Sequence, residues 1–137
     1  MITVQDILKL AVSEEGKKYV FGSLDSYSDP NPKSFDCSGL VRWVCHRLGT
    51  QPPMPEGAIY QMQFCKKQGT LIPIDQAKKT PGALLFRITP PENHVVISLG
   101  DSDKDVEARG AAYGVGSWSE DGRVWTHAAK IPGVEYA

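Results

Sequence analysis

Apolar and polar residues alternate near the N-terminus with the period of an α-helix. The apolar positions follow the spacing i, i+3, i+4 and i+7, and they are Val4, Ile7, Leu8 and Ala11. Thr3 and Asp6 have the spacing of a capping box, in which each side chain accepts a hydrogen bond from the backbone N–H of the other residue. Gly16 is a typical stop signal. The pattern therefore predicts an amphipathic helix that begins after Thr3 and ends before Gly16.

A second helical pattern begins within the stretch FDCSGLVRWVC, residues 35–45. Its apolar face contains Leu40, Val41, Val44 and Leu48. Gly49 is placed to end this helix, and either Asp36 or Ser34 can cap its start. The pattern places Cys37 in the first turn of a helix, directly after an acid.

Turn-forming residues dominate the segments on both sides of this second helix. The stretch 19–35 is rich in Gly, Ser, Asp, Asn and Pro, which predicts an irregular surface loop. Long loops in small domains tend to carry function. A Pro-rich link, TQPPMPEG, follows the second helix, and residues 56–68 then have the pattern of a third, shorter helix between Pro55 and Gly69.

The second half of the chain changes from helical spacing to short runs of β-branched and aromatic residues. Four such runs, separated by Pro, Gly, Asn and Asp, predict strands at 83–88, 94–100, 105–110 and 123–128. Helices followed by strands, without βαβ alternation, indicate an α+β fold in which N-terminal helices pack on a mainly antiparallel sheet. The length of 137 residues and the 41% hydrophobic share predict one domain over residues 1–137.

Charge and hydropathy restrict the classes of partner. Fifteen Lys and Arg residues against sixteen Asp and Glu residues give a net charge of −1, so no overall field recruits nucleic acid or an anionic membrane. We therefore expect neither nucleic acid nor membrane as a partner. The N-terminal stretch contains acids and lacks a basic region, so we expect no signal peptide, and export would need another route.

The three cysteines form an odd set without a C-x-x-C pair, which argues against a disulfide framework and a thiolate zinc site. Cys45 and Cys65 lie in amphipathic stretches, where a cysteine is usually a small buried apolar residue. Cys37 differs because the first turn of a helix offers unpaired N–H groups and the positive end of the helix dipole. Both favour a reactive thiolate, and the N–H groups could hold the oxyanion formed when sulfur attacks a carbonyl. Cys37 is therefore the candidate nucleophile.

A nucleophilic cysteine needs a base, and the chain offers three histidines. His46 lies nine residues after Cys37 on the same helix, too far along it to reach the thiol. His127 falls late in the last predicted strand, where a surface histidine is ordinary. His94 opens a strand directly after a turn, where its side chain can project toward a helix packed on the sheet. We take His94 as the candidate base.

Glu107 is the candidate for the third polar group, which would orient the imidazole. If strands 94–99 and 106–109 form a hairpin, Glu107 lies beside His94 or diagonal to it on the same face. The alternative is a solvent-facing Glu on an edge strand. The alternating acids Asp101, Asp103 and Asp105 between these strands lack the Gly and Glu of a calcium loop, so we expect a solvated turn and no metal site.

These residues lie in motifs that resemble the NlpC/P60 family of papain-like cysteine peptidases. FDCSGLV resembles the nucleophile motif of that family, and HVVISLG resembles its histidine strand. The segment 19–22 is similar to its aromatic-glycine segment, and TPGALLF to its Pro-Gly-Asp-Leu-x-Phe strand. The resemblance runs in family order from about residue 5 to residue 110. Asn93, Ala83 and Glu107 depart from it, standing where the family more often has Gly, Asp, and His, Asn or Gln.

The resemblance implies a papain-like α+β fold with Cys37 as nucleophile, His94 as base and Glu107 at the third position. It also implies that Asp36 and Tyr19 help to bind the free amine of a stem peptide, and that Ser38 lines the site. Arg109 lies two residues after Glu107 on the same strand face and is a candidate for meeting a substrate carboxylate. The alternative for Arg109 is a surface ion pair.

The function that follows from the resemblance is that of a peptidoglycan hydrolase. It would act as a cysteine endopeptidase on cell-wall stem peptides, through a thioester on the sulfur and without a metal or organic cofactor. Small size and the lack of a signal peptide suit a phage lysin or virion-associated enzyme, as a monomer or as a module of a larger lysin. Two alternatives are an amidase or acyltransferase using the same thioester, and a catalytically silent domain that binds stem peptides.

Overall fold

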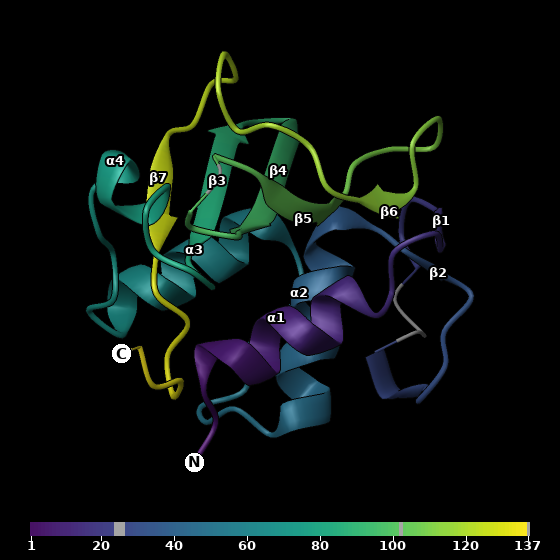
Figure 1. Ribbon diagram of the computed structural model, residues 1–137, viewed down its shortest axis with the longest axis horizontal. Coiled ribbons are helices and arrows are strands. Elements are labelled where there is room, and N and C mark those ends of the chain that lie inside the picture. Colours follow the sequence, from purple (N-terminus) through teal and green to yellow (C-terminus); the bar gives the residue numbers. More distant parts are fainter. Residues whose placement is uncertain (24–26, 102, 137) are drawn as a thin grey trace.

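The computed structural model describes residues 1–23, 27–101 and 103–136. Helices occupy the first half of the chain and most strands the second half (Figure 1). The helices are α1 (Val4–Val12), α2 (Cys37–Leu48), α3 (Ala58–Lys67) and the short α4 (Ile74–Ala77). The strands are β1 (Lys18–Tyr19), β2 (Ser34–Phe35), β3 (Leu84–Thr89), β4 (Glu92–Ser98), β5 (Asp105–Ala108), β6 (Val115–Gly116) and β7 (His127–Ala129). The α+β fold class predicted from the sequence is therefore confirmed.

Five of the strands form one antiparallel sheet, in the order β6-β5-β4-β3-β7. In the pairing of β3 with β4, Phe86 lies opposite Val95 and Arg87 opposite His94. In the pairing of β4 with β5, Ile97 lies opposite Val106. Because side chains alternate between the two faces of a strand, this register divides the sheet into two faces of different chemistry.

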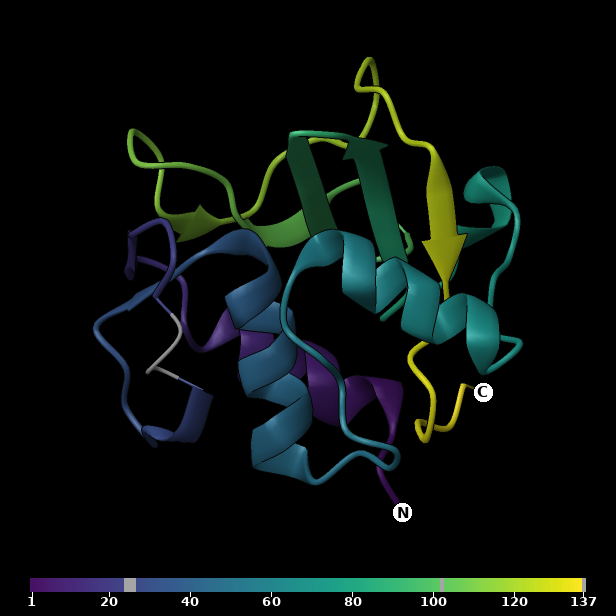
Figure 2. The same cartoon turned by 180° about the vertical axis from the view of Figure 1, so that it is seen from behind.

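One face of the sheet packs against the helices and contains the main core. Figure 2 shows α3 lying across β3, β4 and β7, with α2 beside it. The core includes the fully buried side chains of Trp43, Phe35 and Phe86. The indole N–H of Trp43 is satisfied by the carbonyl of Asp29 at 2.7 Å, so this large side chain is buried without an unpaired donor.

The opposite face of the sheet is apolar at one end and polar at the other. Leu85 and Val96 lie in a smaller core with the side chain of Trp125. Further along the same strand faces come Arg87 and His94, which are paired in register. The candidate site residues of the sheet therefore lie on the face that the main core does not use.

Local signals account for the ends of α1 and α2. In α1, the Thr3 hydroxyl accepts from the N–H of Asp6 at 3.2 Å, and the Asp6 carboxylate accepts from the N–H of Thr3 at 2.9 Å. This is the predicted capping box. The helix α2 begins at Cys37 with Asp36 as its cap and ends at Gly49, whose φ of 77° is left-handed.

The irregular loop predicted for residues 19–35 is tied at both ends by a short ladder. Tyr19 of β1 pairs in parallel with Phe35 of β2. Each of these strands has two residues, too short to leave a periodic pattern in the sequence. Residues 24–26 of the predicted loop lie outside the described residues.

The last predicted strand is shorter than expected, and besides β1 and β2 two further elements were not predicted. The paired strand is His127–Ala129, preceded by Thr126, whose N–H donates to the carbonyl of Phe86 at 2.7 Å. Arg123, at the start of the predicted strand, instead points its side chain to the buried acids of β5. The helix α4 and the strand β6 have four and two residues, below the length at which periodicity is informative.

Two close approaches fix the ends of the chain and of β4. Gly100 follows β4 with a φ of 84°, and a Cβ at this position would meet the backbone nitrogen of Pro81. The two ends of the chain are held together, since the N–H of Glu135 donates to the carbonyl of Ile2 at 2.9 Å. Among the described residues, no helix has the length and apolarity needed to cross a membrane.

Candidate active site

The candidate nucleophile, Cys37, is the first residue of α2. The preceding Asp36 fixes this position with both carboxylate oxygens. One accepts from the N–H of Gly39 at 2.6 Å and caps the helix, and the other accepts from the N–H of Gly22 at 3.2 Å. One acid therefore holds both the start of the helix and the loop that faces it.

The thiol of Cys37 is partly buried, and its Sγ lies 3.9 Å from the carbonyl oxygen of Asn93. Burial, followed by the negative charge of Asp36, raises the pKa of this thiol to about 11. Backbone N–H groups, including that of Ser38, act in the opposite direction but do not outweigh these two causes. The acidification expected from the helix start is thus not found, and Cys37 is a neutral thiol near pH 7.

His94, the candidate base, follows Asn93 directly on β4, so it lies next to the residue that the sulfur contacts. Its side chain is buried, and its Nε2 lies 2.7 Å from Oε1 of Glu107. With Nε2 occupied by the carboxylate, Nδ1 is the ring nitrogen left to serve the thiol. Both Cys37 and His94 line one cleft of about 800 Å³, called here the main cleft.

Glu107 lies diagonal to His94 on the same face of β4 and β5, one of the two arrangements expected from the sequence. It is 1% exposed, and its charge is compensated by Arg123. The two guanidinium nitrogens of Arg123 donate to the two carboxylate oxygens at 2.6 and 2.8 Å. Burial alone would raise the pKa of Glu107, but the hydrogen bonds from Arg123 and His94 outweigh it and hold this pKa well below the ordinary range. Glu107 is therefore ionised.

A second buried acid, Asp105, adjoins this pair. Arg123 donates to Asp105 Oδ2 at 3.2 Å, and the backbone N–H of Trp118 donates to Oδ1 at 3.3 Å. Burial, followed by the interaction with Glu107, raises the pKa of Asp105 to about 9. The two acids therefore hold one proton between them near pH 7, with Asp105 neutral and Glu107 charged.

Arg123 was not predicted from the sequence as a site residue, and Asp105 was predicted in the wrong environment. Asp105 is fully buried, so the expected solvated turn is wrong at this residue. The spacing of Asp105 and Glu107 at i and i+2 was a usable signal, because it puts both carboxylates on one strand face. Arg123 lies 16 residues from Glu107, at the start of the run predicted as a strand over 123–128, and nothing in that run indicated a partner on β5.

The residues expected to bind substrate also line the main cleft, namely Tyr19, Asp36, Ser38 and Arg109. Burial, followed by the charges of Cys37 and Asp36, raises the pKa of Tyr19 to about 12, so its phenol is neutral. The Ser38 hydroxyl accepts from the N–H of Gly57 at 3.2 Å, which ties the start of α3 to that of α2. Glu107, unlike these residues, does not line the main cleft.

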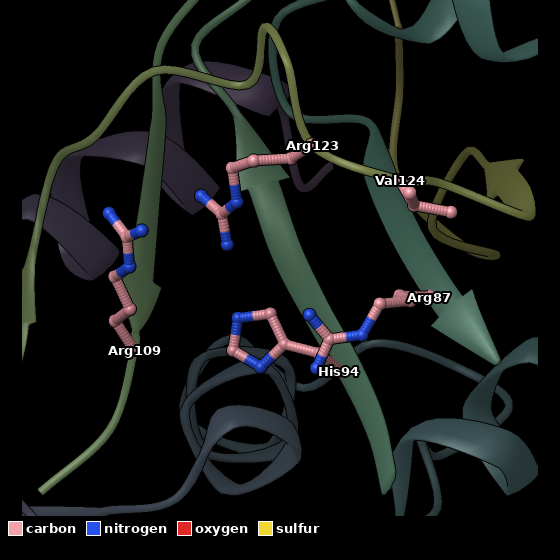
Figure 3. A pocket seen from close by; sticks show the side chains of 5 residues that line it. All are labelled: Arg87, His94, Arg109, Arg123 and Val124. Carbon is pink, nitrogen blue, oxygen red and sulfur yellow. The ribbon is translucent and has the colours of Figure 1, made fainter. Parts of the chain in front are cut away.

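Figure 3 shows the other side of His94, where a smaller pocket of about 300 Å³ adjoins the main cleft. Its lining residues are Arg87, His94, Arg109, Arg123 and Val124, and they define what is called here the arginine pocket. The imidazole of His94 lies among the three guanidinium groups (Figure 3). Among the described residues, no group of three or more His, Cys, Asp or Glu side chains is arranged to hold a metal ion.

Comparison with known proteins identifies relatives of this fold and site. The family model of the NlpC/P60 family matches residues 16–130. The solved NlpC/p60 domain of the peptidoglycan hydrolase SagA is 27% identical, with a TM-score of 0.75 over 95% of this chain and 100% of that domain. The P60 domain of antigen MAP1204 from M. avium subspecies paratuberculosis is 29% identical, with a TM-score of 0.73 over 93% of each chain.

The peptidoglycan hydrolase RipB from Mycobacterium tuberculosis is 28% identical, with a TM-score of 0.74 over 97% of this chain and 65% of RipB. No curated protein sequence matches the chain. The family match covers both sequence motifs, that of the cysteine and that of the histidine, and the shared fold extends over nearly the whole chain. The chain therefore belongs to the NlpC/P60 family.

Proposed function

We propose that this protein is a cysteine endopeptidase that hydrolyses peptide bonds in the stem peptides of peptidoglycan. One observation carries the proposal: the Cys37 sulfur contacts the backbone next to His94, whose Nε2 is bound to Glu107 at 2.7 Å. The relatives SagA and RipB are described as peptidoglycan hydrolases, which supports the same substrate and the cell wall as the place of action.

In the proposed reaction, His94 Nδ1 takes the proton from the Cys37 thiol as the sulfur attacks the carbonyl carbon of the scissile bond. The N–H groups at the first turn of α2 stabilise the resulting oxyanion. When the intermediate collapses, the C–N bond breaks and the imidazolium gives its proton to the leaving amine. Water, activated by His94, then hydrolyses the thioester and restores the thiol.

The ionised Glu107 supports both steps by fixing the ring and stabilising the imidazolium. A protonated His94 needs a negative partner, and the Nε2–Oε1 contact provides one in a buried setting where charge interactions are strong. Arg123 keeps that partner ionised through its two hydrogen bonds to Glu107. Because the pKa of the Cys37 thiol is high, Cys37 transfers its proton to His94 during the attack on the carbonyl carbon and not before substrate binds.

The test is digestion of purified peptidoglycan by the wild-type protein and by matched variants, followed by mass analysis of the products. New amine and carboxyl termini within stem peptides are expected for the wild type. Cys37→Ser and His94→Gln should each lose at least about a thousandfold in rate. His46→Gln is the control, because His46 is exposed in the last turn of α2. Cleavage at the sugar-peptide junction would indicate an amidase, and tight binding without cleavage would indicate a silent binding domain.

A further inference from the structure

The arginine pocket places more positive charge around His94 than the catalytic residues use. Arg87 is paired with His94 in the register of β3 and β4, and Arg109 approaches the same ring from the other side (Figure 3). Both residues line the main cleft as well as the arginine pocket, so their guanidinium groups border the space where a substrate would bind.

Only one of the three arginines is neutralised by an acid. Arg123 donates to both oxygens of the ionised Glu107, and its charge is thereby compensated. Arg87 and Arg109 form no ion pair within the described part of the chain. Glu92 also lines the main cleft, but it pairs with neither of them. Two uncompensated positive charges therefore face the main cleft.

Arg109 is held in place without being neutralised. Its guanidinium carbon lies 4.8 Å from the centre of the Tyr113 ring and 5.4 Å from that of Trp118, and these two rings contact each other edge to face. Aromatic faces attract a cation but leave its N–H groups free to bind an anion. The ion pair considered for Arg109 from the sequence is therefore absent within the described residues, and the donors of this side chain remain available.

The opposite end of the main cleft has the opposite charge. Asp36 precedes Cys37, and within the described residues its carboxylate oxygens accept hydrogen bonds from neutral donors only: two backbone N–H groups and the Ser38 hydroxyl. The reacting pair of Cys37 and His94 thus lies between an anionic end and a cationic end of one cleft. A cleft of this polarity favours a substrate that carries a negative charge on the His94 side of the scissile bond.

We propose that Arg87 and Arg109 form a subsite that binds a carboxylate of the peptide substrate close to the scissile bond. The inference rests on the proposed function and specifies the chemical class of its substrate. Guanidinium groups pair with carboxylates through two parallel charge-assisted hydrogen bonds. A carboxamide at the same place keeps one acceptor oxygen, replaces the other with an N–H donor and carries no charge, so the subsite selects free over amidated carboxyl groups.

The experiment compares soluble stem peptides released from purified peptidoglycan, as prepared and after conversion of their carboxyl groups to carboxamides. We expect the wild type to cleave the free form with a kcat/KM at least about tenfold higher, as charge-assisted hydrogen bonds predict. Replacing Arg87→Gln and Arg109→Gln together should reduce this ratio to near one. Lysine at both positions should restore part of it. Arg47→Gln, which removes an exposed charge from the far end of α2, should keep the full ratio.

Binding of the same two peptide preparations to the Cys37→Ser protein, measured by calorimetry, separates this inference from the proposed function. If the wild type cleaves both forms equally, or the preference survives the double Gln replacement, the carboxylate subsite is refuted while the peptidase stands. If no peptide is cleaved but the free form binds at least about tenfold more tightly through Arg87 and Arg109, the peptidase fails and the subsite stands. If no peptide is cleaved and the free and amidated forms bind equally or not at all, both the peptidase and the carboxylate subsite are refuted.

Discussion

Arg123 is expected to control catalysis without touching the substrate, through the ionisation of Glu107. The informative change is Arg123→Met, which keeps an unbranched side chain against Trp125 but removes the hydrogen bonds that Arg123 donates to Glu107 and Asp105. Glu107 would then keep the imidazole of His94 as a hydrogen-bond partner, and the pKa of Glu107 would rise because its burial is no longer opposed by the guanidinium.

The loss of stability expected for Arg123→Met follows from how deeply its ion pair with Glu107 is buried. Breaking a fully buried ion pair costs about 3–5 kcal/mol, but the Arg123 side chain is 19% exposed and water can partly replace it, so we expect about 2–4 kcal/mol in the free energy of unfolding. Glu107 has a depressed pKa in the folded protein, so its stabilisation is present above the unfolded pKa of about 4.3 and is lost as pH falls further. The destabilisation by Arg123→Met should therefore be larger at pH 7 than at pH 4.

The assay is kcat/KM on stem peptides across pH, together with urea unfolding at the same pH values. Loss of a group that orients a ligand-binding or catalytic side chain typically costs about 10–100-fold, and we expect this range at pH 7. The acid limb of the profile should move to higher pH, because Glu107 must be ionised to hold His94. Arg123→Lys should recover part of both losses, since it restores the charge but not the two-pronged geometry. A Met variant with the wild-type pH profile and stability would refute the role of Arg123.

Three further changes test the protonation of the site and the geometry of the backbone. In the wild type, the free energy of unfolding should fall as pH rises from about 4, the ordinary pKa of Asp, to about 9, because the folded protein holds a proton on Asp105 that the unfolded chain releases. Asp105→Asn should make this fall smaller. Free energies from urea unfolding that fall equally with pH in both proteins would contradict this. Asp36→Asn should lower the pKa of Cys37, seen as iodoacetamide alkylation that rises at lower pH than in the wild type, with Cys37→Ser as the unlabelled control. Gly100→Ala should cost more than Gly16→Ala in chemical denaturation, because both have positive φ but only the first Cβ meets neighbouring backbone; Gly16→Ala should cost about 1–2 kcal/mol.

The helices α1 and α2, and with them the place of Cys37, could be predicted from the sequence because their signals are local. The capping box of Thr3 and Asp6 and the apolar spacing of α1 and α2 are encoded within a few residues of one another. The place of Cys37 at the start of α2 follows from the same spacing. The expected direction of the His94 side chain was wrong, because His94 lies on the sheet face opposite the main core, and Cys37 meets the backbone of Asn93 at the neighbouring position of β4.

Features that depend on tertiary contacts could not be predicted in the same way. The partnership of Arg123 with Glu107 arises only after β5 and the segment before β7 are brought together. The pKa of Cys37 depends on how deeply the sulfur is buried and on the charge of Asp36. The spacing of residues in the sequence reveals neither the burial of a side chain nor the electrostatic field around it. The unpaired state of Arg87 likewise became visible only with the positions of all the described acids.

The meeting of the two chain ends has a practical consequence for attaching other proteins to this one. Glu135 is joined to the backbone beside Thr3, and both ends lie on the side of the molecule away from the start of α2 (Figure 2). A wall-anchoring module, a fluorescent reporter or a surface linker fused at either end would thus emerge from the same place, behind the catalytic machinery. Such fusions should leave the mouth of the cleft open to a polymer as large as the cell wall.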